Sequence, residues 1–315
     1  MPAKPINTDR LSLTPTRLLL LVAAFLVTSG NWSFFERVTD VYPLDSNNLG
    51  FLVSLVIFFY AFIVLLLLGF SLIMPVRIAA TVFILLAAAT GYYADSLSVV
   101  IDDTMVRNIL QTNINEAADV INTGLILRVA LLGLLPVAVI WLLPLQKASF
   151  LRELRYKLQT AAAAVLVIVL CILPLSDHYA SFFREHKPLR YYSNPSYPIY
   201  SIGKYINQRI QSSITREFTR LAKTVTPAVP GKHPRLVILV VGETVRTDHF
   251  SLNGYKRETT PLLAKEPRVI SYPRVSSCGT STAISVPCMF AYEGREDFDP
   301  DAAEHTENIL DILNR

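Results

Sequence analysis

The sequence predicts an α-helical membrane domain of five transmembrane helices, followed by the start of an α/β domain. Apolar residues make up 52% of the 315 residues and charged residues only 17%, and the apolar excess lies in long runs in the first part of the chain. Further along, short β-branched runs alternate with helical segments, which is typical of α/β folds. We therefore divide the chain into a transmembrane domain (1–177), a connector with a bridging helix (178–234) and the amino-terminal part of an α/β domain (235–315).

Five apolar runs approach the length of about 20 residues that a helix needs to cross a bilayer. Buried core helices are a poor alternative, because the remaining polar residues could not cover so many apolar helices. No small-residue cleavage site follows the first run, which we interpret as a retained anchor. The runs are residues 18–35, 49–70, 76–97, 125–145 and 160–176.

Charges at the ends of these runs predict the topology. Lys and Arg gather on the cytoplasmic side of multi-pass proteins, which puts the amino terminus inside and, after five crossings, everything beyond residue 176 outside. The net charge of +4 mostly reflects these basic segments and gives no reason to expect a nucleic-acid partner. The basic residues are Lys4, Arg10, Arg17, Arg77, Lys147, Arg152, Arg155 and Lys157; the other side carries Glu36, Asp40, Asp45, Asp95, Asp102, Asp103, Glu116 and Asp119.

The connector contains an amphipathic helical pattern over residues 201–225, with basic side chains off the apolar stripe. Such a helix either lies on anionic lipid headgroups or packs on the exported domain. Residues 226–234, rich in proline, read as a linker.

The exported part is expected to contain strands over residues 235–241 and 269–275, a short helix at 260–265, a helix start near Thr282 and a helix at 301–314. Glu243 follows the first strand, and ligands bind outside the carboxyl ends of strands in open α/β sheets. Two strands cannot form a parallel sheet covered on both faces, so we expect the chain to be the amino-terminal part of a longer protein.

A run of hydroxyl residues lies between Cys278 and Cys288. Because disulfides persist in exported segments, the two cysteines favour a disulfide, with a zinc pair as the alternative. Cys171 falls within an apolar run and reads as a small apolar residue. A carboxylate at a strand end and a hydroxyl at a helix start are the parts of a metal-activated nucleophile site; the alternative is an ordinary strand followed by a Ser/Thr-rich turn.

Four motifs carry a family resemblance: residues 242–246 (GETVR), 250–255 (FSLNGY), 259–261 (TTP) and 278–290 (CGTSTAISVPCMF). With them the whole chain resembles the phosphoethanolamine transferases of bacterial inner membranes, most of all the lipid A-modifying, colistin-resistance branch. The resemblance implies a five-helix membrane domain, a bridging helix and a periplasmic domain of the alkaline phosphatase type.

The resemblance also implies roles for single residues. Thr282 matches the nucleophile that carries the phosphoethanolamine group, and Glu243 and Thr282 match ligands of a zinc cofactor. Cys278 and Cys288 match a family disulfide. The remaining zinc ligands of the family lie in a carboxyl-terminal part absent from these 315 residues, so we expect this chain alone to be inactive. Asp248-His249 does not replace them, and we interpret His249 as a surface or loop residue.

Asn108, Thr112 and Glu116 are spaced to share one helix face. By resemblance they line the donor headgroup pocket, where a carboxylate suits the ethanolamine ammonium and Asn and Thr suit phosphate oxygens. The alternative is the polar face of a solvated helix.

The resemblance thus implies transfer of phosphoethanolamine from phosphatidylethanolamine to a lipid A phosphate through Thr282. One alternative is a phosphoethanolamine or phosphoglycerol transferase that acts on another envelope glycan. Another is a non-catalytic membrane fragment that binds lipid or a partner protein. A transporter is disfavoured because the apolar runs lack paired charges. His178, His186, His233 and His305 have no ligand-like spacing and receive no role.

Overall fold

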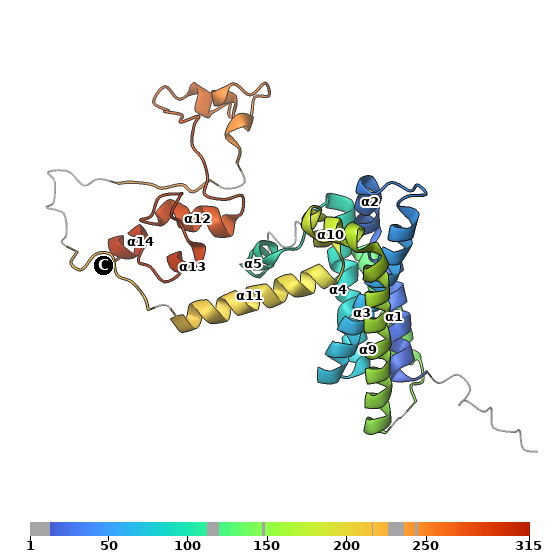
Figure 1. The fold of residues 1–315 in the computed structure, drawn as a ribbon. Coiled ribbons are helices and arrows are strands. Elements are labelled where there is room, and N and C mark those ends of the chain that lie inside the picture. Colours follow the sequence, from blue (N-terminus) through green and yellow to red (C-terminus); the bar gives the residue numbers. More distant parts are fainter. Residues whose placement is uncertain (1–12, 112–119, 147–148, 216, 226–235, 243–244) are drawn as a thin grey trace, which may run out of the picture. The chain divides into compact units, whose positions relative to one another are not determined.

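The computed structural model describes residues 13–111, 120–146, 149–215, 217–225, 236–242 and 245–315, with the side chains of 212–215 left out. The chain forms two compact units, Met1–Tyr205 and Ile206–Arg315. The first unit is helical and carries the predicted membrane spans (Figure 1). The three-part division at residues 177 and 234 stays a prediction.

The first predicted span is broken. Helix α1 (Pro15–Ser29) and helix α2 (Trp32–Val41) meet at an angle of 58°. The side-chain amide of Asn31 donates to the carbonyl oxygens of Leu26 (2.9 Å) and Asn194 (2.7 Å), so the break is hydrogen bonded rather than frayed. Four single helices of the described chain are long and apolar enough to cross a membrane, and five if this bent pair forms one span.

Helices α3 (Leu49–Ile73) and α4 (Val76–Leu97) confirm the second and third predicted spans. Helix α3 packs against α1, α4 and α9 (Phe150–Ile172), and these four helices lie side by side in the bundle of Figure 1. Its apolar residues occupy every face, as expected of a helix buried on one side by protein and on the other by lipid. Leu55, Ile63 and Leu67 are fully buried in the core.

The fourth span consists of α7 (Thr123–Arg128), the π-helical turn η2 (Val129–Leu134) and α8 (Leu135–Leu142). Pro136 lies just after η2 and has no N–H to donate to the preceding turn. A π-helical turn is a common way for a helix to accommodate such a loss. The span therefore covers Thr123–Leu142 rather than residues 125–145.

The fifth span is longer than predicted. The helical segment runs from Phe150 to Arg184 through α9, η3 (Leu173–Leu175) and α10 (Ser176–Arg184). We expected Arg152, Arg155 and Lys157 in a loop, and that expectation is wrong. Lys157 is buried on α9, where its ammonium donates to the Ser71 carbonyl (2.9 Å) and pairs with Glu153 (3.1 Å). Long basic residues are good helix formers, so charge alone did not mark a helix end.

After α10 comes the short helix η4 (Lys187–Tyr192) and then α11 (Ser196–Thr215), the predicted bridging helix. Helix α11 begins five residues before the predicted start at 201. Pro198 does not prevent this, because it lies in the first turn, where no backbone N–H is needed. The helix also ends ten residues before the predicted end at 225. Thr219 instead forms an isolated bridge with Thr306.

The second unit corrects the two predicted strands. The described residues 236–242 and 269–275 form no strand, and the described chain contains only isolated β-bridges. The two segments do not pair with each other, and a strand persists only when its backbone groups find a partner strand. The apolar side chains of the first segment are consequently exposed, as in Leu236 (85%) and Val237 (86%).

Short helices make up the rest of this unit. The helix predicted at 260–265 is a single turn, η7 (Leu263–Lys265), and the one predicted at 301–314 is split into α13 (Pro300–Ala303) and α14 (Ile309–Leu313). The split arises because Asn308 and Asp311 form a capping box that starts a new helix. Beside it, the buried carboxylate of Glu307 accepts from the backbone N–H groups of Leu221 and Ala222 and pairs with Arg315.

Candidate functional site

The predicted nucleophile lies at a helix start, as expected. Thr282 is the first residue of α12 (Thr282–Phe290), it is exposed, and Ser281 precedes it in extended conformation. The Ser281 carbonyl accepts from the N–H groups of Ile284 (3.1 Å) and Ser285 (2.9 Å), which closes the first turn. The Ser281 hydroxyl is buried and has no hydrogen-bond partner among the described residues. The turn therefore presents Thr282 to solvent while its neighbour points inward.

A disulfide fixes this turn. Cys278 and Cys288 are bonded, with their Cα atoms 6.4 Å apart, which confirms the predicted pair. The bond ties the loop before Thr282 to the last turn of α12. Cys171, in contrast, is a free buried cysteine of α9, as predicted.

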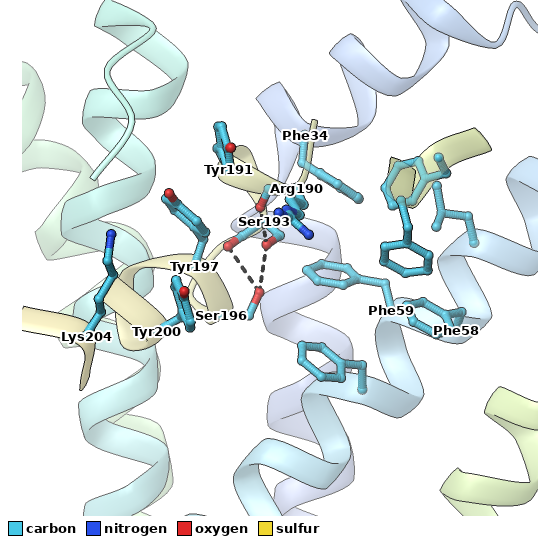
Figure 2. Close-up of a pocket in the computed structure, with 14 residues that line it drawn as sticks. Phe34, Phe58, Phe59, Arg190, Tyr191, Ser193, Ser196, Tyr197, Tyr200 and Lys204 are labelled. Atoms are coloured by element: carbon cyan, nitrogen blue, oxygen red, sulfur yellow. Dashed lines mark hydrogen bonds between the residues drawn. The ribbon is translucent and has the colours of Figure 1, made fainter. Parts of the chain in front are cut away.

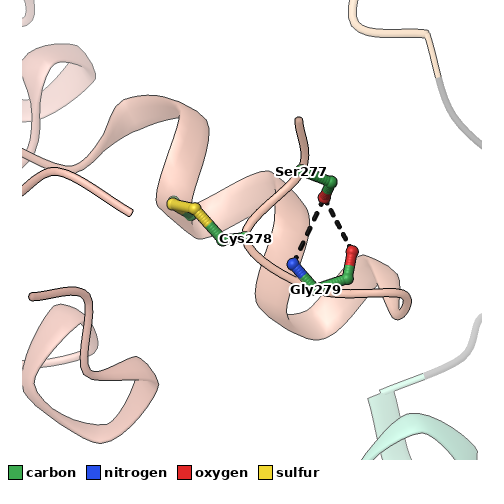
Figure 3. The surroundings of a disulfide bond; sticks show 4 residues. Ser277, Cys278 and Gly279 are labelled. Carbon is green, nitrogen blue, oxygen red and sulfur yellow. Dashed lines mark hydrogen bonds between the residues drawn. A yellow bond between two sulfur atoms is a disulfide. The ribbon is translucent and has the colours of Figure 1, made fainter. Parts of the chain in front are cut away.

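Gly279 allows the loop to lie against α12. A Cβ atom at this position would be 2.8 Å from the Ile284 Cγ2 atom, which is too close for any other residue. Next to it, the Ser277 hydroxyl donates to the Gly279 carbonyl (2.7 Å) and accepts from the Gly279 N–H (3.3 Å), as Figure 3 shows. Glycine and the disulfide together hold the approach to Thr282 in one shape.

Asp248 and His249 form hydrogen bonds with each other and with the nearby Arg246. Arg246 donates to both carboxylate oxygens of Asp248, at 3.1 and 2.8 Å, and His249 Nδ1 lies 2.9 Å from the first of them. These hydrogen bonds from Arg246 and His249 lower the pKa of Asp248 to about 2. The carboxylate is thus ionised and already paired. His249 lies at the end of the single turn η5 (Thr247–His249) and is exposed, so it is a surface residue rather than a loop residue.

The described residues contain no group of three or more His, Cys, Asp or Glu side chains that could hold a metal ion. Glu243, the predicted zinc ligand after the first strand, lies outside the described residues. The described part of the chain therefore does not supply a complete metal site of its own, and Thr282 together with Glu243 remains a prediction.

Of the three predicted headgroup residues, Asn108 lies on α5 (Asp103–Gln111), while Thr112 and Glu116 lie outside the described residues. The Asn108 side-chain oxygen is buried. At the start of α5, Asp103 pairs with Lys204 of α11 (2.9 Å), and the hydrogen bond that the Lys204 ammonium donates to this carboxylate raises the pKa of Lys204. The helix carrying Asn108 is thereby tied to the bridging helix within the first unit.

Sequence reasoning missed a cavity of about 590 Å³ within this first unit. Figure 2 shows polar residues of η4 and the start of α11 on one side of it and phenyl rings on the other. Arg190, Ser193 and Tyr197 belong to the polar side, and Phe34, Phe58 and Phe59 to the apolar side. The density of Tyr and Pro in residues 187–200 was the available signal, and we interpreted that stretch only as a connector.

Comparison with known proteins covers both units. A family profile described as "Phosphoethanolamine transferase EptA/EptB" matches residues 57–210, and one described as "Sulfatase" matches residues 235–315. Among curated proteins, phosphatidylethanolamine transferase Mcr-1 of Escherichia coli is 39% identical over 310 residues, covering 97% of this chain and 57% of the relative. Phosphoethanolamine transferase EptA of E. coli K12 is 36% identical over 310 residues, covering 97% of this chain and 56% of that protein.

A solved structure is similar throughout. The integral membrane lipooligosaccharide phosphoethanolamine transferase A of Neisseria meningitidis matches with a TM-score of 0.83 and 30% identity, covering 96% of this chain and 57% of that one. This chain therefore spans a little over half the length of the relatives it matches. The apolar helices and this match confirm a multi-pass membrane protein with the start of a sulfatase-type domain. The chain belongs to the phosphoethanolamine transferase family and corresponds to its amino-terminal part.

Proposed function

We propose that the protein from which this chain comes transfers phosphoethanolamine from phosphatidylethanolamine to a phosphate of lipid A. The observation that carries the proposal is Thr282 at the exposed start of α12, held by the Cys278–Cys288 disulfide. The donor is supported by the name of the E. coli Mcr-1 relative, a phosphatidylethanolamine transferase. The acceptor class is supported by the lipooligosaccharide enzyme of N. meningitidis and by a Kdo(2)-lipid A transferase that is 27% identical over 255 residues.

In the first step, the Thr282 hydroxyl oxygen attacks phosphorus, the bond from phosphorus to the glycerol oxygen breaks, and diacylglycerol leaves with the threonine proton. In the second, a lipid A phosphate oxygen attacks the phosphothreonine, and the Thr282 oxygen leaves and recovers a proton. The amide N–H groups and the positive dipole end at the start of α12 favour a phosphate both in the bound donor and on Thr282.

Zinc belongs to the proposal, with Glu243 and Thr282 as two of its ligands. When bound, it would lower the pKa of the Thr282 hydroxyl, which is otherwise a weak nucleophile. Structural zinc has four ligands and catalytic zinc at least three from protein, so the remaining ligands must come from residues other than those described here. We therefore propose that the 315-residue chain is inactive by itself.

Localisation follows the same proposal. The amino terminus lies in the cytoplasm, the helices cross the inner membrane, and the unit with Thr282 faces the periplasm. There Thr282 can reach the donor and acceptor lipids, and the disulfide persists because the compartment is oxidising.

The test compares this chain with the same chain extended to the length of its relatives by their carboxyl-terminal residues. We expect mass spectrometry of lipid A to show added phosphoethanolamine only with the extended form. Thr282→Ala should abolish the addition, with Thr280→Ala as the matched control. Modified lipid A from the short chain, lost on Thr282→Ala, would contradict the proposed inactivity. Addition that persists in the extended Thr282→Ala variant would contradict the nucleophile.

A second test addresses the donor pocket. In the extended form, Asn108→Ala, Thr112→Ala and Glu116→Ala should each lower donor turnover, Glu116→Ala by about tenfold or more, since an ammonium–carboxylate contact contributes about 1.5–3 kcal/mol. Zinc content and fold should be unchanged. Gln111→Ala, on the same helix and exposed, is the control. Unchanged turnover in all three variants would return these residues to the polar face of a solvated helix.

A further inference from the structure

The cavity at the start of α11 has the form of a lipid site. Its volume of about 590 Å³ lies within the range of small-molecule pockets. Its apolar wall is built from α2, α3 and α10, and its polar side from η4 and α11, all within the first unit (Figure 2).

The apolar wall consists of phenyl rings that are not fully packed. Phe62 and Phe183 are each 36% exposed, although Phe58 contacts both, with ring centroids 6.4 Å and 6.0 Å apart. Behind them, Phe34 and Phe59 are buried and pack on one another at 5.1 Å. A wall of this kind suits an apolar chain more than a polar metabolite, because the occupant must remove phenyl surface from water.

The polar side carries two cations, of which one is paired with a carboxylate and the other is not. The charge of Lys204 is engaged by Asp103. Arg190 pairs with no carboxylate among the described residues, and its guanidinium lies 5.8 Å from the Tyr191 ring centroid, an arrangement that leaves its fork of N–H donors available. A planar guanidinium is suited to two-point recognition of phosphate.

The hydroxyl groups near Arg190 are largely satisfied by each other. Ser196 donates to the Ser193 hydroxyl (2.9 Å), which itself donates to the Arg190 carbonyl (2.6 Å). These bonds hold the Arg190 backbone next to the start of α11. Because these hydroxyl groups are committed to one another and to the backbone, the Arg190 guanidinium is the main group left for an anion.

Among the described residues that line the cavity, none is Asp or Glu. Lys204 is neutralised by Asp103, which leaves Arg190 as the uncompensated charge of the lining. The ammonium of a phosphatidylethanolamine headgroup would thus meet this cation without a free carboxylate, whereas a lipid with a net negative charge matches it. We propose that this cavity binds an anionic glycerophospholipid, such as phosphatidylglycerol, with an acyl chain among the phenyl rings and its phosphate at Arg190. Asn108, the described residue of the predicted donor pocket, does not line this cavity, and lipid binding there does not depend on transfer activity.

The experiment uses the purified, delipidated 315-residue chain in detergent micelles, mixed with phosphatidylglycerol and phosphatidylethanolamine of identical acyl chains. Native mass spectrometry then counts the bound lipid. We expect about tenfold preferential retention of phosphatidylglycerol. Arg190→Gln should remove the preference, and Phe58→Ala should lower retention of both lipids. Arg184→Gln, an exposed arginine on α10 outside the cavity, should behave as the unaltered chain.

A conservative variant and a competition with free phosphate complete the experiment. Arg190→Lys keeps the positive charge but loses the two-point contact with phosphate, so the preference for phosphatidylglycerol should be weaker but still measurable. This variant tests the proposal even if Arg190→Gln does not fold. Millimolar inorganic phosphate should fail to displace the lipid. Equal retention of the two lipids by the unaltered chain, a preference unaffected by Arg190→Gln, or displacement by phosphate would each overturn the proposal.

Discussion

At the scale of single residues, Asn194 connects parts of the chain that lie far apart in sequence. Its side-chain amide donates to the carbonyl oxygens of Gly30 (3.0 Å) and Ala87 (2.8 Å), and its side-chain oxygen accepts from the Thr90 hydroxyl (2.8 Å). Its backbone N–H donates to Asn31 (2.8 Å). Asn194 is buried, with 3% of its surface exposed, so water cannot replace these bonds.

We therefore expect Asn194→Ala to lower the free energy of unfolding by about 2–3 kcal/mol, because buried polar groups lose their partners. The change is measurable by denaturant titration of the purified chain in micelles. Asn47→Ala, at an exposed position, is the control. A loss below about 0.5 kcal/mol for the buried variant would show that other groups or water satisfy the freed partners.

Asn194 also shows why part of the structure could not be predicted. The apolar runs located the spans because burial in lipid requires long apolar segments. Nothing local in Asn194 distinguishes it from an ordinary turn residue, since its partners lie 104 to 164 residues away. The cavity at Arg190 escaped prediction for the same reason: helices that are distant in sequence build its two sides.

At the scale of elements, α12 and the loop before it behave as one piece. The disulfide closes a separation of 10 residues, and Gly279 lets the loop contact Ile284. Both the helix start and the disulfide were predictable, because the motif 278–290 is short and its constraints are local. The two strands were not correctly predicted, because a β-branched run has strand propensity but requires a partner supplied by the tertiary fold.

Since Cys278 and Cys288 are bonded to each other, we expect neither to be alkylated when no reductant is added. The protein for this test carries Cys171→Ala and is exported to an oxidising compartment. Replacing both by serine should increase amide hydrogen exchange in α12, since a closed loop of this size contributes about 2–3 kcal/mol in the chain-entropy picture. The readouts are mass spectrometry of the alkylated protein and of exchanged peptides. Labelling of both thiols in unreduced protein would be the contrary result.

At the scale of the whole molecule, the two units differ in how they bury apolar surface. The first unit has a continuous core that includes Leu19, Ile63 and Phe83. In the second, most of the described apolar segment 236–241 is widely exposed, with Ile238 at 76% and Val240 at 82%. A buried-strand sequence without a partner strand is an unpaired edge with no covered face.

We thus expect residues 236–242 to exchange amide hydrogens within seconds in the 315-residue chain, while amides in α3 remain protected for hours. In the chain extended to the length of its relatives, the same segment should gain protection by at least about a hundredfold, because paired core strands exchange only through larger openings. Hydrogen exchange with mass spectrometry measures both. Equal exchange of this segment in the two forms would mean that the added residues do not pair with it.

The bend between α1 and α2 has a consequence for biogenesis. Its Asn31 side chain is hydrogen bonded to a residue 163 positions later. At translation rates of about 5–20 residues per second, that residue is synthesised on the order of ten to thirty seconds after Asn31. During this interval the Asn31 side chain can make only its local hydrogen bond to Leu26. Its two bonds to Asn194 can form only after the last part of the membrane domain has been synthesised.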